Sequence, residues 1–413
     1  MKVFKFGGAS LKNAKGVRNV GTILSQSPRA LLVVVSAMGK TTDMLERVHQ
    51  AFNEATNFRS KLDESREYHY DIIDELFDKP LPVRHAVDAL FDQLENDIRL
   101  KEDFDTIYDQ VVSKGELISS MIVYHHLREL QLQVDWLDAR KCIATDRTFR
   151  EGKVDWDLTE FNIRKHKEQL KDRIVITQGF IGCTPDGLTT TLGREGSDFS
   201  AAIFASSLGA DSVTIWKDVP GVMNADPKRL SGAVVFEELP FKEAAEMTYY
   251  GASVIHPKTI KPLANKGIPL LVKNFDDPSL PGTRIHECKV SQLPPLIVFK
   301  DNQCLVSCKV TDYTFINEEQ LLTIFGILNE LDIRINVMQN SAISFSFCID
   351  FRESKVLALI HRLQAFFEVF YNTGLTLITV KNYDDTIFEM YRKRPGVILE
   401  QSSRSTLQIL VKN

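Results

Sequence analysis

The hydrophobic run at residues 30–35, Ala-Leu-Leu-Val-Val-Val, has no polar residue on either face. A half-solvated strand alternates polar and apolar residues, so this run is typical of a parallel strand covered by helices on both sides. Residues 41–132 are expected to be mainly helical. Further elements are expected as strands at 134–137, 173–177 and 212–216, with a helix at 198–208. This alternation predicts an α/β body whose sheet is sandwiched between helices.

The clearest break in the chain is the Leu-Pro-Pro sequence at residues 293–295. We expect one domain at 1–293 and a smaller α+β domain at 296–413. The second should contain a helix at 323–328 followed by a strand at 333–337, and a final strand at 406–411. Residues 384–405 are expected to lack a helix.

Composition excludes several classes of protein. The net charge of −5 and the pI of about 6.0 give no basic field for nucleic acid or anionic lipid. Neither a signal peptide nor an 18-residue apolar run is evident, so we expect a cytoplasmic protein with no membrane partner. Six scattered cysteines argue against a disulfide framework. Cys304 and Cys308 share one face of a predicted strand, but two further zinc ligands are not evident, and we interpret them as buried thiols.

The segment from Lys5 to Ser10, Lys-Phe-Gly-Gly-Ala-Ser, follows an apolar strand. The backbone N–H groups of a paired-glycine turn can converge on an oxyanion, and the lysine adds a full positive charge. The segment therefore fits a phosphate site. A tight strand-to-helix turn without a ligand explains it as well when it is taken alone.

A second glycine-containing segment imitates a P-loop but is not one. The sequence from Gly39 to Thr42 is Gly-Lys-Thr-Thr, yet the first glycine of a P-loop would fall at Val34, inside the predicted strand. Ser36 and Thr42 still lie near the carboxyl end of that strand, where α/β sheets bind ligands. Each is equally compatible with capping the next helix. The helical region before Gly115 is rich in acids and bases without a catalytic spacing, and its carboxylates are interpreted as a solvated face.

Two later segments add binding chemistry. At residues 191–198, Thr-Leu-Gly-Arg-Glu-Gly-Ser-Asp, the glycines allow close backbone approach and Arg194 offers a planar fork for a carboxylate. Ser197 or Asp198 is expected to cap the following helix. Residues 216–228 follow with a strand end and a long polar loop containing two prolines. Such a loop suits the wrapping of a nucleotide.

In order, these segments resemble the signatures of the aspartate kinases (aspartokinases). Also similar are Val34–Ala37, Gly115–Glu116, Ala244–Met247 and His256–Pro257, so the resemblance covers nearly all of residues 1–290. It implies the amino-acid kinase fold, a mostly parallel sheet between helix layers, followed by an ACT-like regulatory and dimerisation region. The implied reaction is phosphorylation of the side-chain carboxylate of L-aspartate by ATP and Mg²⁺, which leads to lysine, threonine and methionine.

The resemblance also implies residue roles. The implied catalytic pair is Lys5 and Asp198. The implied substrate contacts are Ser36, Thr42, Glu116, Arg194 and Ser197. The implied nucleotide contacts are Lys5, Gly7, Gly8, Ser10, Lys217, Asp218, Met223 and Lys228. No protein-held metal is implied, because Mg²⁺ arrives with ATP. A carboxylate nucleophile is already ionised at neutral pH, so no histidine base is required, and His256 is expected to cap local structure.

The chain departs from the family pattern in places. Met223 replaces a frequent tyrosine, and Ser253 replaces a lysine that often contacts ATP, which is expected to weaken nucleotide affinity by ~1–3 kcal/mol. The C-terminal part fits one ACT-like module and a reduced partner. Such modules commonly pair through sheet edges, so a homodimer is expected.

Inhibition by lysine or threonine is also expected to differ from the family pattern. Lysine-sensing relatives often have a glycine where residues 317–321 read Asn-Glu-Glu-Gln-Leu, and tend to have an acid where Asn336 stands. We therefore predict weak or absent inhibition by lysine or threonine.

Two other functions stay open at this point. One is another amino-acid kinase, acting on glutamate or acetylglutamate, which the segment at 191–194 and the ACT-like tail disfavour. The other is a non-catalytic amino-acid-binding regulator. Retention of Lys5, Glu116, Arg194 and Asp198 argues against a silent protein.

Overall fold

The computed structural model describes residues 1–168, 170–252, 255–290, 293–311 and 314–412. The chain divides into two compact units. The first contains Met1–Val222, Val235–Ala245 and Val254–Val290, and the second contains Met223–Val234, Glu246–Ser253 and Ser291–Asn413. None of the described helices is both long and apolar enough to cross a membrane.

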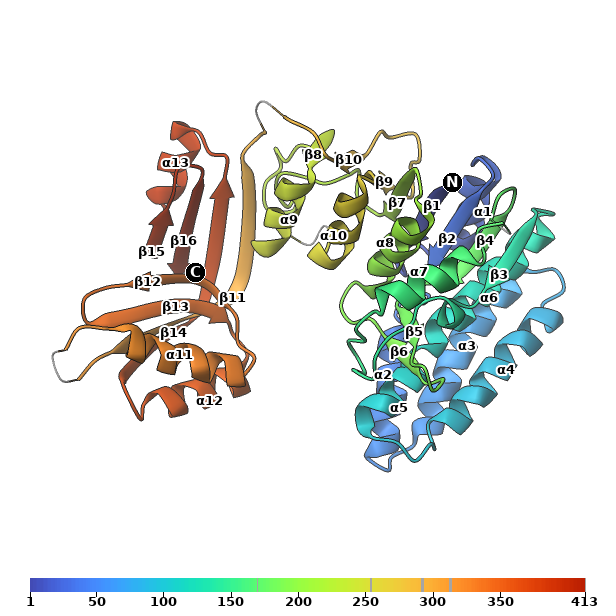
Figure 1. Cartoon of the computed structure of the whole chain (residues 1–413), viewed down its shortest axis with the longest axis horizontal. Coiled ribbons are helices and arrows are strands. Elements are labelled where there is room, and N and C mark those ends of the chain that lie inside the picture. The colour runs from blue at the N-terminus through green and yellow to red at the C-terminus, as the bar shows by residue number, and fades with distance from the viewer. Residues whose placement is uncertain (169, 253–254, 291–292, 312–313, 413) are drawn as a thin grey trace. The chain divides into compact units, whose positions relative to one another are not determined.

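Most of the regular structure in the first unit precedes residue 222 (Figure 1). The strands up to residue 290 are β1 (Lys2–Phe6), β2 (Leu31–Val35), β3 (Val134–Leu137), β4 (Ile174–Gln178), β5 (Ile181–Cys183), β6 (Thr189–Thr191), β7 (Ser212–Lys217), β8 (Glu238–Pro240), β9 (Leu270–Asn274) and β10 (Thr283–His286). The helices are α1 (Ala14–Ser25), α2 (Thr41–Asn53), α3 (Phe58–Leu76), α4 (Leu81–Asp97), α5 (Phe104–Val112), α6 (Lys114–Glu129), the short 3₁₀ helix η1 (Ala139–Lys141), α7 (Trp156–Arg164), α8 (Gly196–Leu208), α9 (Phe241–Tyr249) and α10 (Pro257–Lys266).

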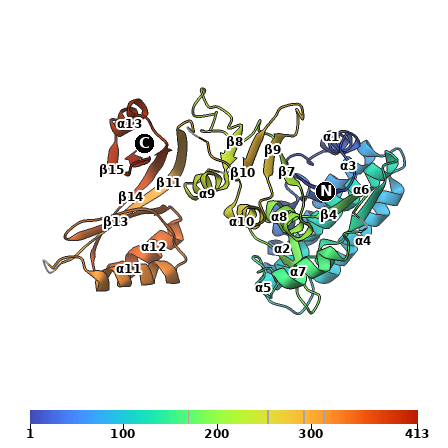
Figure 2. The ribbon, with the colours of Figure 1, turned by 45° about the horizontal axis from the view of Figure 1, so that its top comes forward.

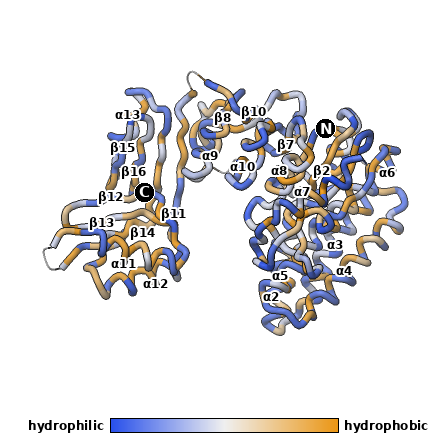
Figure 3. The backbone as a smooth tube through the Cα atoms, in the orientation of Figure 1, coloured by the Kyte–Doolittle hydropathy of each residue, from blue (hydrophilic) through white to orange (hydrophobic). Residues whose placement is uncertain are grey.

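The main sheet of the first unit has the order β3-β4-β2-β1-β7-β9-β10-β8. Neighbouring strands are parallel except for the antiparallel pair β9 and β10. Hydrophobic and hydrophilic residues alternate along α3 and α4 (Figure 3), as expected for helices that cover a core on one side. The predicted fold class, a mostly parallel sheet between helices, is confirmed, as are the helical region 41–132 and the strand at 30–35.

Strand β1 divides its side chains between the two faces of the sheet. Phe4 and Phe6 belong to the hydrophobic core that also contains α1, α3, α4 and α6. Because side chains alternate along a strand, Lys5 points to the opposite face, against which α8 packs. In the register of β1 with β7, Lys5 pairs with Ile215, so Lys217 is expected on the same face as Lys5.

The second unit contains a six-stranded sheet of order β12-β13-β11-β14-β16-β15, with antiparallel neighbours. Figure 2 shows strands β11, β13, β14 and β15 of this sheet from a second direction. Its strands are β11 (Leu296–Lys309), β12 (Ile335–Asn340), β13 (Ser344–Asp350), β14 (Glu368–Lys381), β15 (Val397–Ser402) and β16 (Thr406–Lys412). Its helices are α11 (Glu318–Glu330), α12 (Glu353–Leu363) and α13 (Asp385–Arg392). The predicted helix, the strand after it and the final strand are confirmed.

The expectation that residues 384–405 lack a helix is wrong. Helix α13 lies in this stretch, and the side chain of Asp384 caps it by accepting the N–H of Ile387 at 2.8 Å. Phe388 and Tyr391 pack against a core formed with β14 and β16. An eight-residue helix is too short to produce a clear hydrophobic period, so packing decides its formation.

The cysteine interpretation agrees with the structure. Cys304 and Cys308 are free, buried and part of one hydrophobic cluster under α11 and α12. Burial raises the pKa of the Cys304 thiol to about 11 and that of Cys308 to about 12. Both are therefore neutral packing residues at physiological pH.

Candidate active site

The strand ends and helix starts of the first unit surround a cavity of about 600 Å³. Its walls are contributed by Lys5, Gly8, Ser36, Ala37, Gly39, Thr42, Glu46, Tyr108, Glu116, Arg150, Phe180, Thr191, Gly193, Arg194, Glu195, Gly196, Ser197, Asp198 and Lys217. All seven residues implied as catalytic or substrate-binding are in this set. The cavity lies at the carboxyl ends of parallel strands, where open α/β sheets bind ligands.

The loops after β1 and β2 touch at Gly8. The N–H of Gly39 donates to the carbonyl oxygen of Gly8 at 3.0 Å, and a Cβ atom on Gly8 would lie 2.7 Å from the carbonyl oxygen of Ala37. Only glycine permits this backbone approach. Val34 lies within β2 and is fully buried, which agrees with rejection of a P-loop.

Asp198 lies between two lysines on the α8 face of the sheet. Its Oδ1 is 2.7 Å from Nζ of Lys5, and its Oδ2 is 3.7 Å from Nζ of Lys217. Burial disfavours the charged form of Asp198, but the two ammonium groups outweigh this effect and hold the pKa of the carboxyl below its ordinary value. Lys5, Asp198 and Lys217 together therefore carry two positive charges and one negative charge. This excess of positive charge favours the binding of a polyphosphate.

Glu116 occupies the first turn of α6 and is buried. Its Oε1 accepts the N–H of Ala37 at 3.3 Å, while Oε2 has no hydrogen-bond partner among the described residues. Burial raises the pKa of Glu116 to about 8, against the attraction of Lys5. A buried carboxyl with an unused oxygen beside a cavity fits a cationic group of a ligand, which would restore its charge.

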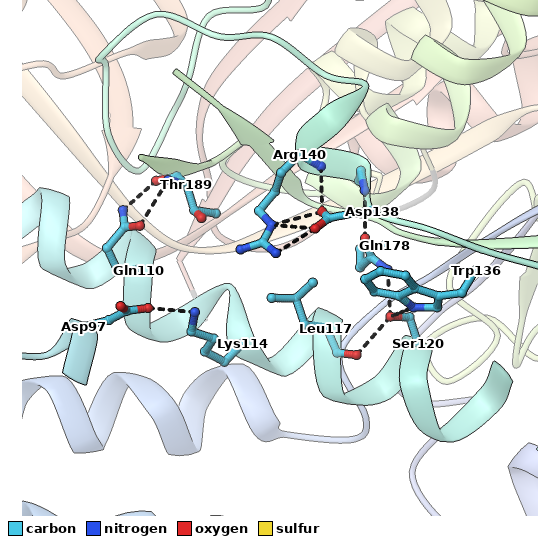
Figure 4. Close-up of polar contacts among 11 residues, drawn as sticks. Asp97, Gln110, Lys114, Leu117, Ser120, Trp136, Asp138, Arg140, Gln178 and Thr189 are labelled. Atoms are coloured by element: carbon cyan, nitrogen blue, oxygen red, sulfur yellow. Dashed lines mark hydrogen bonds and ion pairs between the residues drawn. The ribbon is translucent and has the colours of Figure 1, made fainter. Parts of the chain in front are cut away.

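Buried polar contacts fix α6 against the sheet (Figure 4). Ser120 accepts from Nε2 of Gln178 at 2.7 Å and from Nε1 of Trp136 at 3.0 Å, and Gln178 accepts the N–H of Ala139 at 2.8 Å. The preceding residue of α6 adds a further bond, because the hydroxyl of Ser119 donates to the carbonyl oxygen of Ser36 at 2.7 Å. Together these bonds hold the helix of Glu116 against the end of β2.

Helix α8 begins differently from the prediction. Neither Ser197 nor Asp198 is its N-cap, since both already lie in the first turn. The N-cap is Glu195, whose φ of 54° is left-handed and whose side chain makes no capping bond. Instead, its carboxylate accepts the N–H of His256 at 2.9 Å. His256 itself caps α10 through Nδ1, as expected.

The remaining predicted nucleotide contacts are not in the cavity wall. A Cβ atom on Gly7 would lie 3.4 Å from Nζ of Lys5, and Ser10 is buried in the turn, where its N–H donates to the oxygen of Gly7. Asp218 follows β7 directly. Met223 and Lys228 belong to the second compact unit. The departure at Ser253 lies outside the described residues.

The interpretation of the carboxylates in the helical region before Gly115 as a solvated face is wrong for two of them. Glu46 lines the cavity and Asp109 is fully buried. Tyr108 and Arg150 also line the cavity and were missed. No spacing in the sequence signals them, because α2, α5 and the loop before α7 come together only in the folded chain.

Comparisons with known proteins match this architecture. The sequence pattern of the amino acid kinase family matches residues 1–274. Lysine-sensitive aspartokinase 3 of Escherichia coli (strain K12) is 33% identical over 92% of this chain and 87% of its own length. The chain belongs to the amino acid kinase family, among the aspartokinases.

Other aspartokinases extend the match. The bifunctional aspartokinase/homoserine dehydrogenase of Daucus carota is 32% identical over 90% of this chain, which spans 42% of that longer protein. E. coli aspartokinase III in complex with lysine and aspartate has a TM-score of 0.85 at 28% identity, covering 100% of this chain and 96% of that one. The same enzyme with aspartate and ADP has a TM-score of 0.84 at 29% identity and the same coverage.

Proposed function

We propose that the chain transfers the γ-phosphoryl group of ATP to the side-chain carboxylate of L-aspartate and releases ADP and 4-phospho-L-aspartate. This is the entry step to lysine, threonine and methionine. The observation that carries the proposal is the Lys5–Asp198–Lys217 group beside Glu116 in one cavity. Kinship with aspartokinases, one of them known in complex with aspartate and ADP, supports the choice of substrates.

The reaction brings two anions together, so its barrier is lowered mainly by charge neutralisation and positioning. A carboxylate oxygen of aspartate attacks the γ-phosphorus, the bond to the bridging oxygen of ADP breaks, and no proton needs to be removed. Lys5 and Lys217 offset the charge on the transferring group. Asp198 holds both ammonium groups in position, so little reorganisation accompanies the transfer.

The acceptor amino acid has one cationic and two anionic groups. Glu116, with its unused oxygen, is proposed to bind the ammonium group. Arg194, Ser36, Thr42 and Ser197 are proposed to receive the carboxylates.

The nucleotide side combines glycine amides with cations. Gly7, Gly8 and Ser10 are proposed to hold phosphates beside Lys5, and Lys217, Asp218, Met223 and Lys228 to contact the nucleotide. The described residues contain no group of three or more His, Cys, Asp or Glu that could hold a metal ion. Mg²⁺ is proposed to be carried by the ATP phosphates, where it would neutralise part of their charge.

Residues 296–413, which make up most of the second unit, are proposed to form an ACT-like domain that follows a kinase domain at 1–293. Homodimer formation through this region is proposed because large apolar side chains on it are exposed, among them Phe325, Leu322 and Phe370.

Release of ADP, measured with a coupled assay over a panel of amino acids, tests the function. We expect release that depends on L-aspartate and not on glutamate or N-acetylglutamate. Turnover with either alternative in preference to aspartate would reassign the substrate, and no turnover with any amino acid would favour a non-catalytic regulator.

A further inference from the structure

Asp109 of α5 is a buried carboxylate that the proposed reaction does not use. Its exposed fraction is 0%. Oδ1 accepts the hydroxyl of Thr191 at 2.8 Å. Oδ2 accepts two backbone N–H groups, that of Thr191 at 2.8 Å and that of Arg150 at 2.9 Å. Three hydrogen bonds satisfy the carboxylate and offset part of the cost of its burial.

Both partners of Asp109 belong to the cavity wall. Thr191 ends β6 and is followed by Leu192, whose N–H donates to the oxygen of Phe180 at 2.8 Å, and then by Gly193 and Arg194. The position of Thr191 therefore sets where the segment carrying Arg194 begins.

Arg150 is held in an unusual conformation. Its φ is 66°, in the left-handed region that costs a non-glycine residue ~1 kcal/mol or more. The bond from its N–H to Asp109 stabilises this backbone. Its guanidinium carbon lies 4.1 Å from the centroid of the Tyr108 ring, and Nη1 lies 3.3 Å from Oδ1 of Asp105. One carboxylate thus fixes two segments that meet at the cavity from distant parts of the sequence.

We propose that Asp109 is a positioning residue for recognition of the amino-acid substrate, acting through Thr191 and Arg150. The proposal deepens the proposed aspartate kinase function and rests on it. Lys5 and the glycine turn after β1 make no contact with Asp109 among the described hydrogen bonds and ion pairs. Loss of Asp109 should therefore weaken aspartate binding more than ATP binding.

The ionisation of Asp109 agrees with this role. Burial raises its pKa to about 6, although the N–H groups of Arg150 and Thr191, the Thr191 hydroxyl and the charge of Arg150 all act in the opposite direction. At pH 8 the carboxylate is ionised and accepts all three bonds.

The test measures Michaelis constants for aspartate and ATP at pH 8, with melting temperatures. Asp109→Asn is nearly isosteric but replaces one acceptor oxygen by a donor, and should raise the aspartate constant about three- to tenfold. Asp109→Ala should raise it at least about tenfold. The ATP constant should change less than about twofold. Thr191→Val, which removes only the hydroxyl partner, provides a second folded variant and should raise the aspartate constant in the same direction.

The matched control is Asp138→Asn. Asp138 is also buried, and it accepts the N–H of Arg140 at 3.0 Å and the Arg140 guanidinium (Figure 4). It is not among the residues that line the cavity. Asp138→Asn should lower the melting temperature without changing the Michaelis constant for aspartate. The positioning role would be overturned if the Michaelis constants for aspartate and ATP changed equally. It would also be overturned if Asp109→Asn and Thr191→Val lowered the melting temperature and changed neither constant. If the wild type releases no ADP with aspartate, the proposed function itself fails.

Discussion

Lys5 is the residue on which the proposed chemistry depends most. It contacts Asp198 at 2.7 Å and is a buried residue of the cavity wall. A cation that contacts the transferring phosphoryl group acts most strongly in the transition state. Lys5→Ala is therefore expected to lower turnover by at least ~100-fold while the far-ultraviolet circular dichroism spectrum stays unchanged. A variant with more than half of wild-type turnover would remove Lys5 from the mechanism.

The raised pKa of Glu116 predicts that substrate binding is coupled to the release of a proton. With a pKa of about 8, the carboxyl is mainly protonated at pH 7 in the empty site. Binding of the aspartate ammonium beside it favours the charged form, so close to one proton should be released per site. Calorimetric titration at pH 7 in buffers of different ionisation enthalpy measures this number. Glu116→Gln should abolish the release, and an unchanged release in that variant would contradict the assignment.

The same raised pKa has a consequence for folding stability. Between pH 5 and 8 the folded chain keeps a proton on Glu116 that the unfolded chain loses, so this group's contribution to stability falls as pH rises through that window. Glu116→Gln should therefore become more stable relative to the wild type as the pH of a ligand-free thermal melt increases. A difference in melting temperature that stays constant from pH 5 to 8.5 would be incompatible with the raised pKa.

At the scale of elements, the loops that follow β1 and β2 pack directly against each other, because Gly8 has no side chain to separate them. Gly8→Ala places a Cβ atom 2.7 Å from the carbonyl oxygen of Ala37, so one loop must move. We expect a loss of ~1–3 kcal/mol of unfolding free energy and weaker ATP binding.

A matched control for this prediction is Gly326→Ala. Gly326 lies in α11, and a Cβ atom there would meet nothing within 4 Å. Because alanine has the higher helix propensity, this change should stabilise the second unit by up to ~1 kcal/mol. Urea unfolding of both variants measures the contrast. A Gly8→Ala protein as stable as the wild type would contradict the close contact.

The elements differ in how well sequence alone predicts them. The apolar run of β2 and the turn after β1 carry local signals, and alternation along β1 already separates Lys5 from Phe4 and Phe6. No local sequence signal marks Asp109, Glu46 or Arg150, because their neighbours in the fold come from other elements. Helix α13 was not predicted because it is short. The sequence carries only a weak signal for it: Asp384 can cap a helix, and Phe388 and Tyr391 are three residues apart, as on one helix face.

For the whole molecule, we predict weak or absent inhibition by lysine or threonine, in contrast to the E. coli relative, whose name states lysine sensitivity. The side chain of Asn336 is already engaged: it donates to Gln303 at 2.7 Å and to Asp350 at 2.9 Å, and accepts from Nζ of Lys300 at 2.8 Å. The ammonium of Lys300 and the carboxylate of Asp350 are also paired with each other at 2.7 Å, so neither is a free partner for a lysine ligand. The predicted reduction of the second ACT-like module rested on the absence of a helix at 384–405, where α13 in fact lies.

Titration of each amino acid into the ADP-release assay, at aspartate near its Michaelis constant, checks this prediction. Half-inhibition by either at concentrations below about 1 mM would be inconsistent with it. Asn336→Asp, which introduces an acid at the same position, should increase any response to lysine.

The central claim is transfer of a phosphoryl group to the side-chain carboxylate of aspartate, and chemical trapping of the product tests it most directly. The product is an acyl phosphate, which hydroxylamine converts to a hydroxamate. Incubation with ATP, Mg²⁺, L-aspartate and hydroxylamine should yield the hydroxamate of the aspartate side chain in amounts equal to the ADP formed, and Lys5→Ala should yield almost none. Release of ADP without hydroxamate, or a hydroxamate formed from glutamate in preference to aspartate, would contradict the account.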